Sequence, residues 1–267
     1  MTAPQPVPQP AVPPVQPAFS LPLATRADMF VRLLAVQGAW NYETMLGNGI
    51  AFCMEPALKR LPGGRGGPRY REAMARESRY FNAHPYFAAV AVGALARAEL
   101  EGEPPTRIER FRGAVCGPLG SCGDRLGGAA WLPLCSLVAL LTWTLGGGPL
   151  LVVGLFLGLY NIGHLALRAW ALHVGLQRGM QVAGALGAPW LRRGPEWLGQ
   201  LGAAAAGLTL PLAFGRVLGS PVEPLLPLAA LGAAVSALVL VRVQGRVEGW
   251  RIALPFLVLL VLISVIV

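Results

Sequence analysis

The hydrophobic and polar positions divide the chain at about residue 126. Before this point, apolar residues recur at helical spacing but are interrupted by charges, Gly and Pro; after it, long apolar stretches alternate with short linkers. Residues 126–163 contain no Asp, Glu, Lys, Arg or His. That run is long enough for two membrane crossings, because one crossing needs about 20 apolar residues. Pro149, preceded by three glycines, divides the run where a tight turn between two helices is expected.

The second half of the chain predicts about five crossings. They are placed at 129–145, 149–167, 197–215, 224–241 and 251–267. The linkers 168–196 and 242–251 carry more arginines than acids, and basic linkers of this kind stay in the cytoplasm. This orientation puts the N-terminus in the cytoplasm and the C-terminus outside.

The first half predicts shorter helices. Two or three interrupted amphipathic helices are expected in 26–61, a loop at 62–69, and a charged amphipathic helix at 70–82. The apolar run in 84–99 is too short to span a membrane and suits a re-entrant or buried helix. The fold class expected is therefore an all-α integral membrane protein, with about five transmembrane helices preceded by amphipathic and re-entrant helices. Its regions are a disordered Pro-rich tail at 1–25, an amphipathic and re-entrant helical region with cytoplasmic loops at 26–125, and a transmembrane region at 126–267.

Composition supports this class. Charged residues make up 13% of the chain, against about 25% in ordinary soluble domains, and 54% of residues are hydrophobic. The net charge of +9 comes almost entirely from arginines spread between apolar blocks, so we exclude a nucleic-acid-binding role. The four cysteines form no CxxC pair and are expected to be reduced, packed thiols. They are Cys53, Cys116, Cys122 and Cys135. We expect no metal site and no cofactor.

The segment VCGPLGSCGDRLGG, residues 115–128, places Asp124 among glycines at the start of the most apolar stretch. A carboxylate at bilayer depth costs about 2.5–3.5 kcal/mol and therefore faces protein or a water-filled cavity. Two compatible interpretations follow. Asp124 could be the N-cap of a helix that starts near Arg125. Alternatively, the glycines form a re-entrant loop that lines a solute site, where Asp124 accepts hydrogen bonds from ligand hydroxyls.

Four segments occur in the order of one known family and cover roughly residues 26–180. GAWNYETMLGNGIAFCMEPALKRL resembles QGSWNFERMQxLGFxxxxxPAxxRL, and YFNAHPYFAAVAVGALARAE resembles FFNTxPxxAxxxxGxxxAxEE. GPLGSCGDRLGG is similar to GPLAGxGDxxFWG, and GPLLVVGLFLGLYNIGHLALRAWALHVGLQRG is similar to GPLLFFxLFNxxRLxxRxxGxxxGYxxG. The chain thus resembles the IID membrane component of the mannose/fructose/sorbose-type phosphotransferase system.

This resemblance implies a sugar permease of the bacterial inner membrane. IID pairs with a IIC membrane subunit, and IIC–IID pairs are expected to form an oligomer. A hexose of the mannose, fructose or sorbose type is phosphorylated during uptake by the cytoplasmic IIB subunit, which receives its phosphate from IIA. IID itself carries no phosphorylated residue, so no catalytic residue is expected in this chain.

The resemblance also selects candidate sugar-binding residues. Sugars offer many hydroxyls, and carboxylates and amides can satisfy several of these at once. Trp40 could supply an aromatic platform for a sugar face or act as an interfacial anchor. His84 precedes a proline and suits a packed position better than a catalytic one. The candidates are Trp40, Asn41, Glu43, Asn82, His84 and Asp124.

The chain departs from the family pattern after Asp124. The pattern has aromatic residues and then Arg-Pro, whereas this chain has Gly127, Gly128 and Leu132-Pro133. These changes could alter sugar contacts or packing against IIC. The alternative function is therefore a degenerate IID-like membrane protein with a regulatory or sensing role and no transport.

Overall fold

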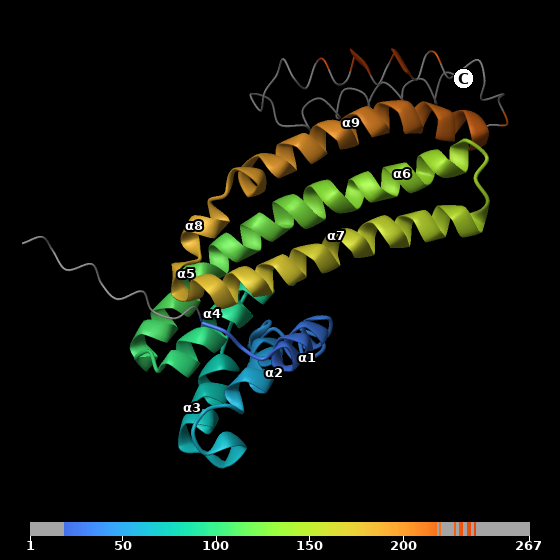
Figure 1. The fold of residues 1–267 in the computed structure, drawn as a ribbon. Helices are drawn as coiled ribbons and strands as arrows, with labels where there is room; N and C mark the ends of the chain where they lie inside the picture. Colours follow the sequence, from blue (N-terminus) through green and yellow to red (C-terminus); the bar gives the residue numbers. More distant parts are fainter. Residues whose placement is uncertain are drawn as a thin grey trace, which may run out of the picture.

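The computed structural model describes residues 19–217, Gly219 and isolated residues between 227 and 238. The described part is helical, which confirms the all-α class. Figure 1 shows the elements in chain order. They are α1 (Leu23–Leu33), α2 (Gly47–Leu58), the 3₁₀ turn η1 (Gly64–Gly66), α3 (Pro68–Glu77), α4 (Ala88–Glu101), α5 (Pro105–Gly123), the π-helix η2 (Asp124–Trp131), α6 (Leu132–Thr144), α7 (Pro149–Arg178), the 3₁₀ turn η3 (Gly179–Gln181), α8 (Ala183–Leu186) and α9 (Pro189–Val217).

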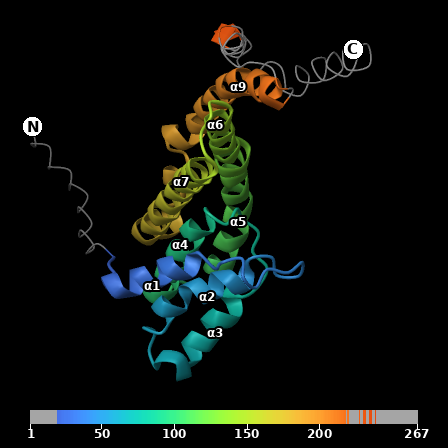
Figure 2. The same ribbon diagram turned by 90° about the vertical axis from the view of Figure 1, so that its right-hand side faces the viewer.

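Long helices form one part of the molecule and short helices the other. Helices α6, α7 and α9 run side by side, while α1 to α4 gather at one end of them (Figures 1 and 2). Three helical segments of the described chain are long and apolar enough to cross a membrane: Pro105–Thr144, Pro149–Gln181 and Ala183–Val217. They contain three of the five crossings expected from the sequence. The other two, at 224–241 and 251–267, lie outside the described residues.

The turn between α6 and α7 forms where the glycines and proline predict it. Helix α6 ends at Thr144, Gly146 adopts a positive φ of 96°, and α7 begins at Pro149. Proline is favoured at the first position of a helix because its missing N–H would have no intrahelical acceptor there. The end of α9 reaches this turn, since Arg216 donates a hydrogen bond of 3.0 Å to the carbonyl oxygen of Thr144.

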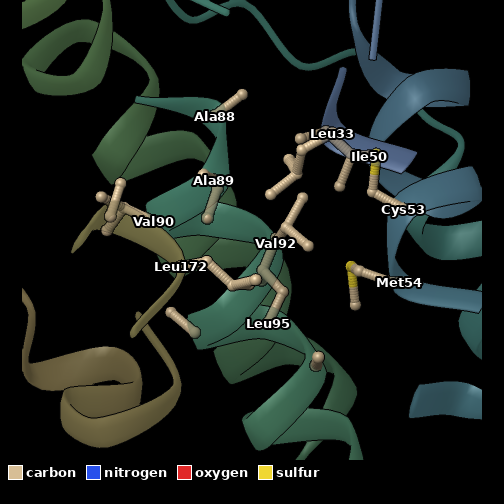
Figure 3. Close-up of a cluster of buried hydrophobic side chains, with 14 of the residues drawn as sticks. Leu33, Ile50, Cys53, Met54, Ala88, Ala89, Val90, Val92, Leu95 and Leu172 are labelled. Atoms are coloured by element: carbon tan, nitrogen blue, oxygen red, sulfur yellow. The ribbon is translucent and has the colours of Figure 1, made fainter. Parts of the chain in front are cut away.

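Helix α4 lies at the centre of the hydrophobic core. Its side chains from Ala88 to Ala96 are almost all inaccessible to solvent, and they pack between α2 and α7 (Figure 3). Helices α4 and α7 touch through backbone atoms: a Cβ added to Gly175 would lie 2.3 Å from the carbonyl oxygen of Val90, and one added to Gly93 would lie 2.7 Å from that of Leu172. The apolar segment expected to be re-entrant or buried is thus a helix enclosed by protein.

Buried ion pairs join the N-terminal helices. The Glu55 carboxylate on α2 lies 2.9 Å from Arg32, 3.0 Å from Lys59 and 2.6 Å from Arg65. Burial acts to raise the pKa of Glu55, but these three cations outweigh it and the pKa falls below its usual value. In the same way, Arg76 on α3 forms an ion pair of 2.9 Å with Glu99 at the end of α4. Such pairs keep otherwise costly charges in the packed region between helices.

The expected linker at 168–196 is partly wrong. Helix α7 continues through Arg168 to Arg178, and Arg168 is buried rather than solvated. Its guanidinium donates to the backbone carbonyl oxygen of Leu33 and lies over the Tyr86 ring, with Cζ 5.0 Å from the ring centroid. These partners compensate part of the burial of its charge, because Arg168 Nε has no hydrogen-bond partner among the described residues. The four cysteines are free thiols, and burial raises the pKa of the Cys53 thiol to about 12, so that it stays protonated.

Candidate functional site

The turn between α1 and α2 carries three of the candidate residues, Trp40, Asn41 and Glu43. The Asn41 amide organises the turn: its Oδ1 accepts hydrogen bonds from the backbone N–H groups of Glu43 (3.0 Å) and Thr44 (2.8 Å), and its Nδ2 donates to Thr44 Oγ1 (2.8 Å). Its hydrogen-bonding capacity is thus largely used inside the turn. Trp40 is 46% exposed and contacts Tyr42 edge-on, and Glu43 is exposed.

The segment 81–86 brings this turn close to the other candidates. The backbone N–H of Phe81 donates to the Thr44 carbonyl at 3.1 Å, and that of Leu46 donates to the Phe81 carbonyl at 2.9 Å. Asn82 follows Phe81 directly and is exposed. His84, two residues further on, lies against Gly123, where an added Cβ would be only 2.1 Å from the His84 Cβ. The α1–α2 turn, the segment 81–86 and the glycine-rich segment around Asp124 are therefore neighbours, with 81–86 in the middle.

Two expectations for Asp124 are wrong. Residues 115–128 are helical, spanning the end of α5 and the start of η2, and they do not form a loop. Asp124 is the residue at which α5 passes into η2, and it caps neither helix with its side chain. Its carboxylate is exposed. A π-bulge inside an α-helix often marks a functional site, which keeps this position of interest.

The glycines of the motif create a flat helix side. Gly123 and Gly127 are four residues apart and face the same way. A Cβ on Gly127 would lie 3.2 Å from His84 Cε1 and 3.3 Å from Tyr86 Cε2, whereas one on Gly128 would meet nothing within 4 Å. The motif glycines thus allow the 84–86 segment to pack directly on the η2 backbone.

A cluster of polar and aromatic residues extends from this packing along α7. We call Tyr86, Tyr160, His164 and Arg168 the α7 polar cluster. The Tyr86 and Tyr160 hydroxyls are hydrogen-bonded to each other, and the Tyr86 ring stacks on His164 with centroids 5.2 Å apart. Beside the cluster, Asn161 Oδ1 lies 2.9 Å from His164 Nε2. His84 contacts the Tyr86 ring edge-on at 4.6 Å, which connects the cluster to the Asp124 motif.

Burial controls ionisation at the edge of this cluster. It lowers the pKa of His84; the Asp124 carboxylate opposes this shift and the Arg168 guanidinium adds to it. Burial also raises the pKa of Tyr86, and its hydrogen bond to Tyr160 acts in the same direction. His84 is therefore a neutral imidazole at neutral pH, and Tyr86 stays protonated. The cluster thus combines neutral donors and acceptors with one fixed positive charge.

Sequence reasoning missed three members of the cluster as site residues. Tyr160, His164 and Arg168 lie four residues apart, so they share one side of α7. Polar residues with that spacing, within and at the end of the predicted crossing 149–167, are a recognisable sign of a functional position. In the described residues no group of three or more His, Cys, Asp or Glu side chains could hold a metal ion.

Comparison with known proteins identifies one family. The profile described as "PTS system mannose/fructose/sorbose family IID component" matches residues 21–207. The "PTS system mannose-specific EIID component" of Escherichia coli K12 is 27% identical over 209 residues, which cover 72% of this chain and 73% of that protein. The "Fructose permease IID component" of Bacillus subtilis 168 is 29% identical over 163 residues, covering 58% of this chain and 57% of the relative.

Solved structures share the fold. A chain of the "CryoEM Structure of Mannose Transporter ManYZ and Microcin E492 (MceA) complex" superposes with a TM-score of 0.56 at 21% identity, covering 91% of this chain and 96% of that one. A chain titled "Structure of membrane protein" gives a TM-score of 0.62 at 22% identity, covering 90% and 96%. At these identities the likeness establishes the arrangement of helices.

Proposed function

This chain belongs to the mannose/fructose/sorbose family of IID components of the phosphotransferase system, and from this premise we propose that it forms a sugar uptake pathway together with a IIC membrane subunit. The family match over residues 21–207 is the observation that carries the proposal. We further propose that the transported solute is a hexose of the mannose, fructose or sorbose type. IIB would phosphorylate the sugar after accepting phosphate from IIA, with no catalytic residue supplied by this chain. The protein would lie in the bacterial inner membrane with its N-terminus in the cytoplasm.

Partnership with IIC is the first part of this proposal that can be tested. In lipid, helices associate through small residues that allow close approach, and α9 carries Gly202, Gly207 and four consecutive alanines. We expect a IIC subunit co-expressed with this chain to remain bound through purification in a mild detergent, as an oligomer of IIC–IID pairs. IIB should bind the complex more weakly, from the cytoplasmic side. Clean separation of the two membrane subunits under these conditions would argue against a shared permease.

The exposed carboxylate of Asp124 is the proposed sugar ligand of this subunit. It follows Gly123, which packs against His84, at the start of η2, where a IIC subunit could complete a hydrophilic pathway. Asp124→Asn preserves the shape of the side chain but removes its charge. If Asp124 binds a sugar hydroxyl, uptake should fall about tenfold or more, because a hydrogen bond to a charged group contributes about 1.5–3 kcal/mol.

The matched control for Asp124→Asn is Glu72→Gln, which removes an exposed acid of α3 that forms no ion pair among the described residues and should leave uptake unchanged. Protein level and IIC association should stay normal in both variants. Normal uptake by Asp124→Asn would exclude Asp124 as a sugar ligand. Loss of IIC association would assign it a role in assembly instead.

A further inference from the structure

A crevice lined by η2, α7 and the first turns of α9 contains two adjacent pockets of opposite character. The start of α9 lies at the end of the long-helix bundle next to the N-terminal helices (Figure 1). One pocket is apolar and the other basic. The apolar pocket shares Tyr86 and His164 with the α7 polar cluster. The inference rests on the membrane location and orientation proposed above, but it does not depend on sugar transport.

The apolar pocket has a volume of about 340 Å³ and aromatic walls. Trp131 Nε1 and His164 Nδ1 are buried here with no hydrogen-bond partner among the described residues. The scarcity of accessible polar groups makes the pocket unsuitable for a sugar, because each buried hydroxyl without a partner is costly. A hydrocarbon chain fits it better. Its walls include Tyr86, Leu126, Trp131, His164, Trp170 and Trp190.

The basic pocket has a volume of about 500 Å³ and is lined by Arg125, Arg192 and Arg193, together with Pro189 and Glu196. In the part of the chain that the structure describes, none of these three arginines forms an ion pair. Three guanidinium groups around one carboxylate leave the pocket positive. Guanidinium groups bind phosphate oxygens through paired hydrogen bonds.

The two pockets share neighbouring residues on both walls. Arg125 and Leu126 are consecutive on η2, and Pro189 and Trp190 are consecutive on α9. The walls lie close together because Gly194 of α9 faces Leu126 of η2. A Cβ added at Gly194 would lie 3.4 Å from Leu126 Cδ1. One elongated molecule can therefore place an anionic group in the basic pocket and an apolar chain in the aromatic one.

We propose that this crevice binds an anionic glycerophospholipid of the cytoplasmic leaflet. Its phosphate lies between Arg125, Arg192 and Arg193, and one acyl chain lies against the tryptophans. Tryptophans concentrate at the membrane–water interface, and basic pockets on the cytoplasmic side attract anionic lipid headgroups. The charge of the basic pocket selects the class of lipid, and the aromatic pocket distinguishes a lipid from a free anion.

Native mass spectrometry of the purified full-length chain tests the proposal. The protein in non-ionic detergent receives dioleoyl phosphatidylglycerol or dioleoyl phosphatidylcholine at equal mole fractions, and retained lipids are counted. We expect one phosphatidylglycerol to be retained at least about tenfold better than phosphatidylcholine. Millimolar inorganic phosphate should not displace it, because free phosphate has no acyl chain for the aromatic pocket.

Two variants test the basic pocket and the apolar pocket separately. The double variant Arg192→Gln/Arg193→Gln should reduce retention of phosphatidylglycerol about 25-fold, since each basic residue contributes about a fivefold preference. Ala166→Phe, which adds a ring beside the aromatic pocket, should also reduce it. The control is Arg110→Gln, because Arg110 is exposed on α5 and donates only to its own helix, at the Thr106 carbonyl.

Three results would overturn the proposal. Equal retention of both lipids, or full retention by the double arginine variant, would exclude a specific anionic lipid. Displacement by inorganic phosphate would indicate an anion site without a lipid. Loss of the retained lipid when IIC is co-purified would identify the crevice as a protein interface.

Discussion

Gly175→Ala is expected to force α4 and α7 apart and to destabilise the folded protein by about 3 kcal/mol or more. The methyl group would lie 2.3 Å from the Val90 carbonyl oxygen and 2.9 Å from the Ala94 backbone nitrogen. These are atoms of a buried helix, so no flexible side chain can move aside. Helix α4 would have to shift within the core that it centres. Thermal unfolding of the purified protein in detergent measures the loss.

The control for Gly175→Ala is Gly158→Ala, also on α7. A Cβ at Gly158 meets nothing within 4 Å. Because alanine favours a helix over glycine by about 1 kcal/mol, this change should be neutral or slightly stabilising. Equal stability of the two variants would mean that α4 and α7 are not in backbone contact.

Arg168→Leu is expected to have the second largest effect, on both stability and transport. The change leaves the Leu33 carbonyl with only the long 3.4 Å hydrogen bond from the Val36 N–H, at a cost of about 1–3 kcal/mol, and removes the cation from the face of Tyr86. Tyr86 would then lose one of the groups that hold it between His84 and His164. We expect a lower unfolding temperature, measured as for Gly175→Ala, and any loss of uptake should follow the loss of folded protein.

Two further variants show whether the effect of Arg168→Leu comes from the loss of the buried guanidinium. Arg168→Lys should restore only part of the stability, because an ammonium cannot reproduce the planar guanidinium that both donates to a carbonyl and stacks on a ring. Arg178→Leu removes an exposed arginine at the end of the same helix and should have little effect. If Arg168→Leu proves as stable as Arg178→Leu, the buried position of Arg168 is incorrect.

Local signals were sufficient for much of the fold. The glycines before Pro149 end one helix and start the next through short-range backbone preferences, and the turn is found there. The long charge-free run likewise forms two antiparallel helices. The short apolar segment that forms α4 was recognisable as a re-entrant or buried helix because of its length and lack of charge, and it is buried.

Long-range packing explains what the sequence did not predict. Glycines at 123 and 127 suggest a loop when considered locally, yet they lie within helices, and glycine is required there because His84 and Tyr86 occupy the space that side chains would need. Arg168 looked like a linker charge because its acceptor, Leu33, is 135 residues away. The same distance in sequence hid the α7 polar cluster, which forms only when 84–86 packs between η2 and α7.

The central claim is that this chain is a subunit of a sugar permease. The most direct measurement is the accumulation of phosphorylated sugar in cells that lack other uptake routes and express IIA, IIB and IIC with or without this chain. Labelled mannose, fructose and sorbose supplied separately would also identify the substrate. We predict that at least one sugar phosphate accumulates only when IIC, IIB and this chain are all present. Equal accumulation without this chain, accompanied by altered IIB phosphorylation or gene expression, would contradict the claim and support a regulatory role.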